Sequence, residues 1–141
     1  MSTIKDKSVD FAFIAAVSEL LFALLPFAVV FIVFTYQEKG WTTYLMAPEW
    51  AFASALLFGQ SIVKLVQGVL NPSVNANSPA VTLVISLLIV FGLVPSMVLL
   101  AIVLTGTAPP LWIGVTQVIL AIIASIVFVV FAAVAHDFAN P

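Results

Sequence analysis

Apolar residues fill four long runs of the chain, and polar or turn-forming residues separate these runs. The runs cover about 11–36, 50–70, 80–105 and 111–135. A hydrocarbon core about 30 Å thick is crossed by roughly 20 helical residues, so each run is long enough for one transmembrane helix. We expect the first run to be retained as a helix, because it is longer than the apolar part of a signal peptide.

The connections between the runs are short and contain many turn-forming residues. They read QEKGWTTYLMAP, NPSVNANSP and GTAPP. Short connections of this composition place consecutive helices side by side and antiparallel. The pattern therefore predicts an all-α integral membrane protein in which residues 1–141 form one small antiparallel bundle of four transmembrane helices, with no soluble domain.

Composition strengthens this interpretation and excludes several classes of function. Hydrophobic residues make up 64% of the chain and charged residues 7%, which is outside the range of soluble domains. The chain has no Arg and only four Lys, too few for a basic surface that binds nucleic acid. It has no Cys, so disulfides, thiolate metal sites and thiol catalysis are excluded.

Lysines and aromatic residues predict the orientation of the bundle. Lys5 and Lys7 lie on the side of the amino terminus, whereas Lys39 is the lysine of the opposite loops. The positive-inside rule then places both termini in the cytoplasm and the 37–48 loop outside, and we expect a plasma membrane, such as the bacterial inner membrane. Trp and Tyr residues fall at the outer interface and are predicted to be interfacial anchors: Tyr36, Trp41, Tyr44, Trp50 and Trp112.

Two charged residues lie inside predicted transmembrane helices. Glu19 precedes the middle of the first run, and Lys64 follows the middle of the second by a similar number of residues. In antiparallel helices these offsets bring the two side chains to a similar depth. A lone charge in the membrane costs about 2.5–3.5 kcal/mol on insertion scales, which favours a direct or water-bridged pair. The alternative is that Lys64 extends to the headgroups independently.

Lys64 belongs to a polar stripe on the second predicted helix. Gln60, Lys64, Gln67 and Asn71 follow the i, i+4, i+7, i+11 spacing of one helix face, whereas Val63 is expected to point elsewhere. Amides in hydrocarbon need hydrogen-bond partners. The stripe therefore either forms hydrogen bonds between helices of the bundle or lines a water-filled path between several subunits.

Small residues and prolines suggest two further features. Ala51, Ala55 and Gly59 form a ladder of small residues that would allow another helix to approach closely. Pro26 and Pro95 occupy matching places in similar stretches, ALLPFAVVF and GLVPSMVLL, and each should kink its helix. Paired interruptions can mark a transport site between repeats, but proline is also ordinary in membrane helices.

The sequence contains little that points to catalysis. His136 and Asp137 lie together near the carboxyl terminus. They could bind a metal or act as a base, but a second His, a nucleophile and a pocket are missing from the pattern, so an interfacial helix cap is the simpler interpretation. We therefore expect no enzyme activity, no cofactor and no metal site.

Three functional hypotheses follow from these features. The first is an oligomeric channel or pore lined by the polar stripe. The second is a non-catalytic interaction, accessory or immunity-type subunit that recognises another membrane protein. The third is a proton-coupled small transporter that uses Glu19. The expected partners are the lipid bilayer and either further copies of the chain or another membrane protein.

Overall fold

The computed structural model describes residues 14, 17–22, 24, 25, 28–33, 35, 36, 40–69, 78–105 and 110–139, with Ser78 and residues 136–139 described by backbone alone. Regular structure in these residues is entirely helical. The elements are α2 (Trp41–Leu45), α3 (Glu49–Val69), α4 (Ser78–Leu88), the π-helix η1 (Ile89–Leu93), α5 (Val94–Leu104) and α6 (Leu111–Ala139). The described residues between 14 and 36 are also helical, and we call them the N-terminal segment.

Three helical stretches are long and apolar enough to cross a membrane, which suggests a membrane protein. They cover Trp41–Val69, Pro79–Leu104 and Leu111–Ala135. These stretches correspond to the last three predicted runs, and the first of them begins earlier than expected because the short helix α2 precedes α3. The predicted all-helical class is confirmed for the described residues. The first predicted run lies partly outside them.

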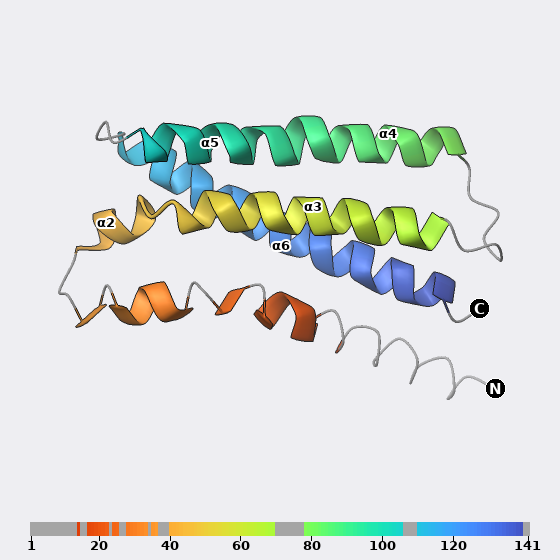
Figure 1. The fold of residues 1–141 in the computed structure, drawn as a ribbon, viewed down its shortest axis with the longest axis horizontal. Helices are drawn as coiled ribbons and strands as arrows, with labels where there is room; N and C mark the ends of the chain where they lie inside the picture. Colours follow the sequence, from red (N-terminus) through yellow and green to blue (C-terminus); the bar gives the residue numbers. More distant parts are fainter. Residues whose placement is uncertain are drawn as a thin grey trace.

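The helices lie alongside one another, and α3 is the central element. Figure 1 shows α3 between the rod formed by α4, η1 and α5 and the N-terminal segment, with α6 crossing behind it. Of all the described elements, α6 makes the most extensive contact with α3. Both α3 and α6 run away from the end where α2 lies, so these two helices are parallel (Figure 1).

Small residues let α3 and α6 pack closely. The buried positions of α3 on this side alternate in steps of four and three, the spacing of a helix–helix seam: Ala51, Ser54, Phe58, Ser61, Leu65 and Gly68. Buried positions of α6 show the same alternation: Gly114, Gln117, Ala121, Ala124 and Phe128. A Cβ atom on Gly114 would lie 2.9 Å from the carbonyl oxygen of Leu45. A glycine is therefore required at this position near the start of α6, because a larger side chain would clash with Leu45.

Serine hydroxyls on the buried face of α3 are satisfied within the helix itself. Ser54 donates to the carbonyl of Trp50, and Ser61 donates to the carbonyl of Leu57, each at 2.7 Å. Hydrogen bonds of this kind bury a small polar side chain without an unpaired donor. Beside them, Phe58 packs with Phe128 in an apolar cluster, which Leu20 of the N-terminal segment joins at its edge.

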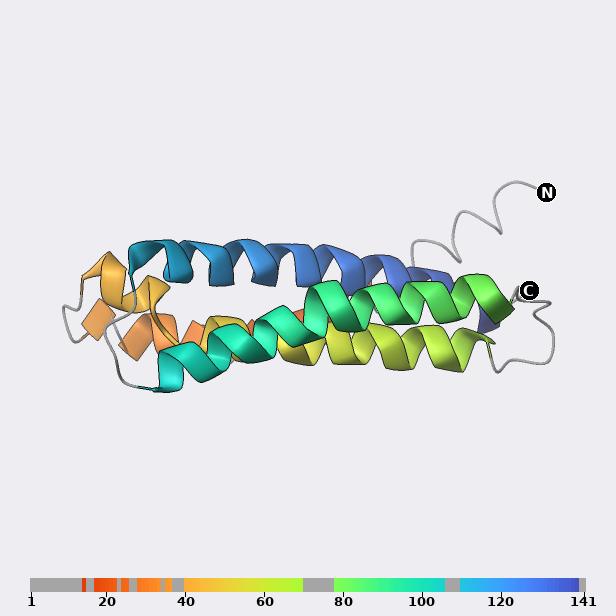
Figure 2. The ribbon, with the colours of Figure 1, turned by 90° about the horizontal axis from the view of Figure 1, so that it is seen from above.

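The π-helix η1 explains how the chain accommodates Pro95. The turn before the proline widens, and the N–H of Val94 bonds to the carbonyl of Ile89 five residues earlier. Figure 2 shows that α4 and α5 differ in direction on either side of this turn. The buried hydroxyl of Ser96 donates to the carbonyl of Gly92 at 2.8 Å. Pro26 lies outside the described residues.

Aromatic residues hold α2 against its neighbours. Tyr44 lies edge-on to Phe31 of the N-terminal segment and to Trp50 of α3, with ring centroids 5.4 Å apart in both pairs. The indole Nε1–H of Trp50 donates to the Tyr44 carbonyl at 3.0 Å. Tyr36, Trp41 and Trp112 expose most of their side chains. Two of the predicted anchors thus help to fix the turn between α2 and α3, and three are available to an interface.

Candidate functional site

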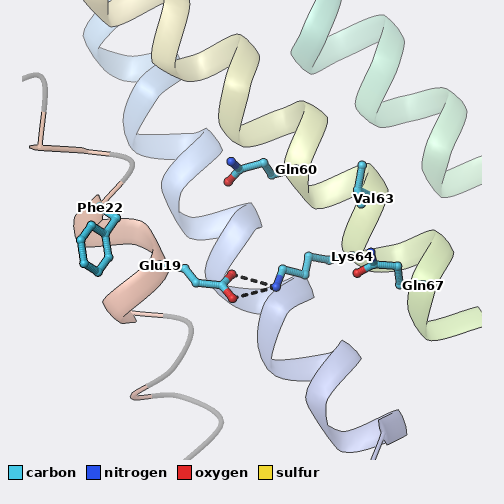
Figure 3. Close-up of a pocket in the computed structure, with 6 residues that line it drawn as sticks. All are labelled: Glu19, Phe22, Gln60, Val63, Lys64 and Gln67. Atoms are coloured by element: carbon cyan, nitrogen blue, oxygen red, sulfur yellow. Dashed lines mark hydrogen bonds and ion pairs between the residues drawn. The ribbon is translucent and has the colours of Figure 1, made fainter.

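The structure brings Glu19 and Lys64 into direct contact. The Nζ atom of Lys64 lies 2.8 Å from Oε2 and 2.9 Å from Oε1 of Glu19, so the ammonium spans both carboxylate oxygens (Figure 3). The Lys64 side chain is 29% exposed and the Glu19 side chain 50% exposed. This ion pair connects the N-terminal segment to α3 and remains open to the surface.

The ion pair lies in a groove of about 560 Å³ that we call the polar groove. Its lining residues are Glu19, Phe22, Gln60, Val63, Lys64 and Gln67. Three members of the predicted stripe therefore share one concave surface, and the fourth, Asn71, lies outside the described residues. Val63 also borders the groove, but its side chain points away from the ion pair (Figure 3).

The groove contains full charges but no net charge. Its described lining residues hold one ammonium group and one carboxylate, which neutralise each other at 2.8 Å. Gln60 and Gln67 make no side-chain hydrogen bond to another described residue. Their amides, each with a donor and an acceptor end, are therefore free to bind a polar group that enters the groove.

A second surface of α3 continues from the groove toward α2. Four exposed apolar residues and the half-buried Gly59 recur along α3 in steps of four and three. We call this set the outer face of α3: Phe52, Leu56, Gly59, Val63 and Val66. A Cβ atom on Gly59 would meet nothing within 4 Å. The predicted small-residue ladder is thus divided, because Ala51 and Ala55 are buried in the fold and Gly59 faces open space.

Sequence reasoning missed Gln117, which is completely buried in α6. Neither its Oε1 nor its Nε2 atom has a hydrogen-bond partner among the described residues. The signal that could have revealed it is its place among the small residues of one α6 face. An unpaired buried amide destabilises a fold by about 1–3 kcal/mol.

The remaining candidates for chemistry, His136 and Asp137, lie near the carboxyl terminus. The side chains of His136 and Asp137 lie outside the described residues. No group of three or more His, Cys, Asp or Glu side chains that could hold a metal occurs in the described part of the chain. No protein-family model, curated protein or solved structure matches this chain, so its function is inferred from its own residues.

Proposed function

We propose that this chain is a non-catalytic membrane protein of four transmembrane helices that associates with another transmembrane helix through the polar groove. In this proposal both termini lie on the cytoplasmic side of a plasma membrane. The observation that supports it is the placement, along one surface groove, of an ion pair and of two amides that make no side-chain hydrogen bond to another described residue.

Membrane depth makes an uncovered polar groove costly. Gln60 lies nine residues before the end of α3 at Val69, which corresponds to about 13.5 Å along a helix axis at 1.5 Å per residue. In a bilayer crossed by α3, this amide lies within hydrocarbon. Each unsatisfied amide there costs several kcal/mol. The groove must therefore be covered by protein or filled by water.

The details of the groove favour a protein helix over water. Lys64 is already neutralised by Glu19 of the same chain, so it supplies no net charge to attract permeating ions. Phe22 and Val63 add apolar surface to the lining. A surface that combines apolar contacts with a few amides is typical of helix association in membranes.

An oligomeric pore is the second candidate, because Gln60, Lys64 and Gln67 share one groove over successive turns. Ion flux through liposomes containing the purified protein distinguishes the two functions. We expect tight liposomes. Currents whose selectivity shifts toward cations in Lys64→Glu would instead support a pore lined by this groove.

A photo-crosslinking amino acid at Val63 tests the proposed association directly. Val63 borders the groove and is 53% exposed, and Ile122 on α6 is 55% exposed and provides a matched control. In native membranes, irradiation should give protein adducts from position 63 and lipid adducts from position 122. Lipid adducts alone from both positions would contradict the proposal.

A further inference from the structure

We infer that a second groove, which runs along α4 and η1, binds a membrane-soluble aromatic molecule that carries two hydroxyl donors, the chemistry of a quinol. This inference does not depend on the polar groove or on its partner. Two observations support it: a backbone carbonyl that loses its hydrogen-bond donors in η1, and a surface groove that ends at this carbonyl.

The π-helix leaves the carbonyl of Val90 without a donor from its own helix. Such a carbonyl accepts from the N–H four residues later in an α-helix and five residues later in a π-helix. The first of these donors belongs to Val94, whose N–H bonds to the carbonyl of Ile89. The second position is Pro95, which has no N–H. Among the described residues, no side chain or other element donates to this carbonyl.

The Val90 carbonyl lies at a depth where other donors are scarce. Val90 is 56% exposed and close to the centre of the apolar stretch Pro79–Leu104, which is long enough to cross a membrane. In a bilayer crossed by this stretch, an unpaired carbonyl at the centre of the hydrocarbon is energetically costly, and water is not there to pair with it. π-Helical turns of this kind are frequent at functional sites.

The same surface is hollowed into a groove of about 680 Å³, which we call the α4 groove. Apolar side chains and two hydroxyl residues line it, among them Thr82, Leu83, Ser86, Leu87, Val90 and Phe91. Pockets for small molecules have volumes in this range and are mostly apolar, with a few polar groups that orient the ligand. The α4 groove therefore fits an apolar ligand of limited size.

Ser86 and Val90 offer hydrogen-bond acceptors to such a ligand. The Ser86 hydroxyl donates its proton to the Thr82 carbonyl at 2.9 Å, which leaves lone pairs on the Ser86 oxygen. The Val90 carbonyl is an acceptor only. The two residues are four positions apart, which corresponds to about 6 Å along a helix axis. A ligand with two donors at a similar separation can pair with both acceptors.

A quinol meets these requirements. Its two hydroxyls lie across one aromatic ring, a separation similar to that of the two acceptors. The Phe91 ring lines the groove and is 70% exposed, so it can pack against the ligand ring. The corresponding quinone carries only acceptors and cannot pair with Ser86 or Val90. Acyl chains have no donor, and a long-chain alcohol keeps its hydroxyl at the membrane interface, away from the depth of Val90.

Ligand retention by the full chain in lipid nanodiscs tests the inference. The probes are a radiolabelled benzoquinol with a short alkyl tail, the quinone of the same structure and the dimethyl ether of the quinol, with empty nanodiscs as the blank. The protein should bind the quinol about tenfold more tightly than either other probe, because neither of these has a donor. Equal retention of the three probes, or retention no higher than in empty nanodiscs, would overturn the inference.

Two variants test the acceptors themselves. Pro95→Ala supplies the missing N–H, so the helix can pair its own carbonyl, and quinol binding should weaken by about tenfold. Ser86→Ala removes the second acceptor and should weaken binding even if Pro95→Ala fails to fold. Pro110→Ala, next to the start of α6 and outside the groove, is the matched control and should bind the quinol normally. Unchanged binding in either folded variant, Pro95→Ala or Ser86→Ala, would contradict pairing with these acceptors.

A photo-crosslinking amino acid at Leu87 distinguishes a small ligand from a protein helix in the α4 groove. Leu87 lines this groove and is 47% exposed. In native membranes, added quinol should reduce the adducts formed from position 87, whereas added quinone should not. Protein adducts that the quinol does not reduce would assign the α4 groove to a partner helix and overturn the inference. Either result leaves the polar groove to its own test at Val63.

Discussion

Replacing Gly92 with alanine should destabilise the fold, although alanine is normally the better helix former. Gly92 is buried in the π-helix η1 against Phe58 of α3. A Cβ atom at this position would lie 2.5 Å from Cδ1 and 2.7 Å from Cε1 of the Phe58 ring. Favourable contacts between carbon atoms occur at about 3.5–4.0 Å, so the new methyl group would overlap the ring by about 1 Å or more.

The Phe58 ring has little room to move, because it is 3% exposed and packs with Leu57, Ala124 and Phe128. Overpacking in such surroundings costs about 1–3 kcal/mol, which outweighs the gain of up to about 1 kcal/mol from higher helix propensity. We therefore expect Gly92→Ala to lower the free energy of unfolding. Adding Phe58→Leu should restore part of the loss, because the smaller side chain leaves space for the methyl group.

The assay is unfolding in mild detergent with increasing denaturing detergent, followed by circular dichroism, at a dilution that keeps copies in separate micelles. Gly59→Ala is the matched control, because its methyl group meets nothing within 4 Å. This variant should be as stable as the parent protein or more stable. The packing explanation is wrong if Gly92→Ala is as stable as Gly59→Ala or more stable. It is also wrong if the double variant of Gly92→Ala and Phe58→Leu loses the full sum of the two single losses.

Three further predictions concern the ion pair, the buried amide and the orientation. Glu19→Gln and Lys64→Met should each lower stability, and the double variant should recover part of the loss; strictly additive losses would show that the two charges are not coupled. Gln117→Leu should raise stability by about 1–3 kcal/mol, because it removes an amide without a described partner, and a decrease would show that the amide is hydrogen-bonded in the membrane. A cysteine at Thr43 should react with an impermeant thiol reagent on intact cells, whereas one at Ser2 should react only after permeabilisation; the reverse pattern would invert the orientation.

Most of the polar groove could be predicted from the sequence. Polar residues inside apolar helices are energetically costly and therefore rare, so they are easy to recognise. Helix periodicity alone placed Gln60, Lys64 and Gln67 on one face. Counting residues from the middle of two antiparallel helices gave Glu19 and Lys64 the same depth, and the structure shows them 2.8 Å apart. The two alternatives for the stripe could not be separated, because the sequence does not show whether that face is covered.

The packing between helices could not be predicted, because the sequence does not show which helices become neighbours. The closest packing joins α3 to α6, two parallel helices far apart in the chain. The contact between Phe58 and Gly92 likewise depends on the rotation of each helix. Pro95 signalled an interruption, but the sequence does not show that the interruption takes the form of a π-helix, because this depends on the surrounding packing. Gln117 resembles any isolated polar residue until its burial is known.

Collision accessibility of a nitroxide spin label at position 63 tests the central claim most directly. The label is attached to Val63→Cys in liposomes, with Ile122→Cys on α6 as the lipid-facing reference. Oxygen concentrates in hydrocarbon, and a polar nickel chelate stays in water. Because we propose that the groove is covered by a protein helix, position 63 should collide rarely with either reagent, and position 122 should collide frequently with oxygen alone. Frequent collisions with oxygen at position 63 would show a lipid-facing groove, frequent collisions with the nickel chelate would show a water-filled path, and either result would contradict docking of a helix.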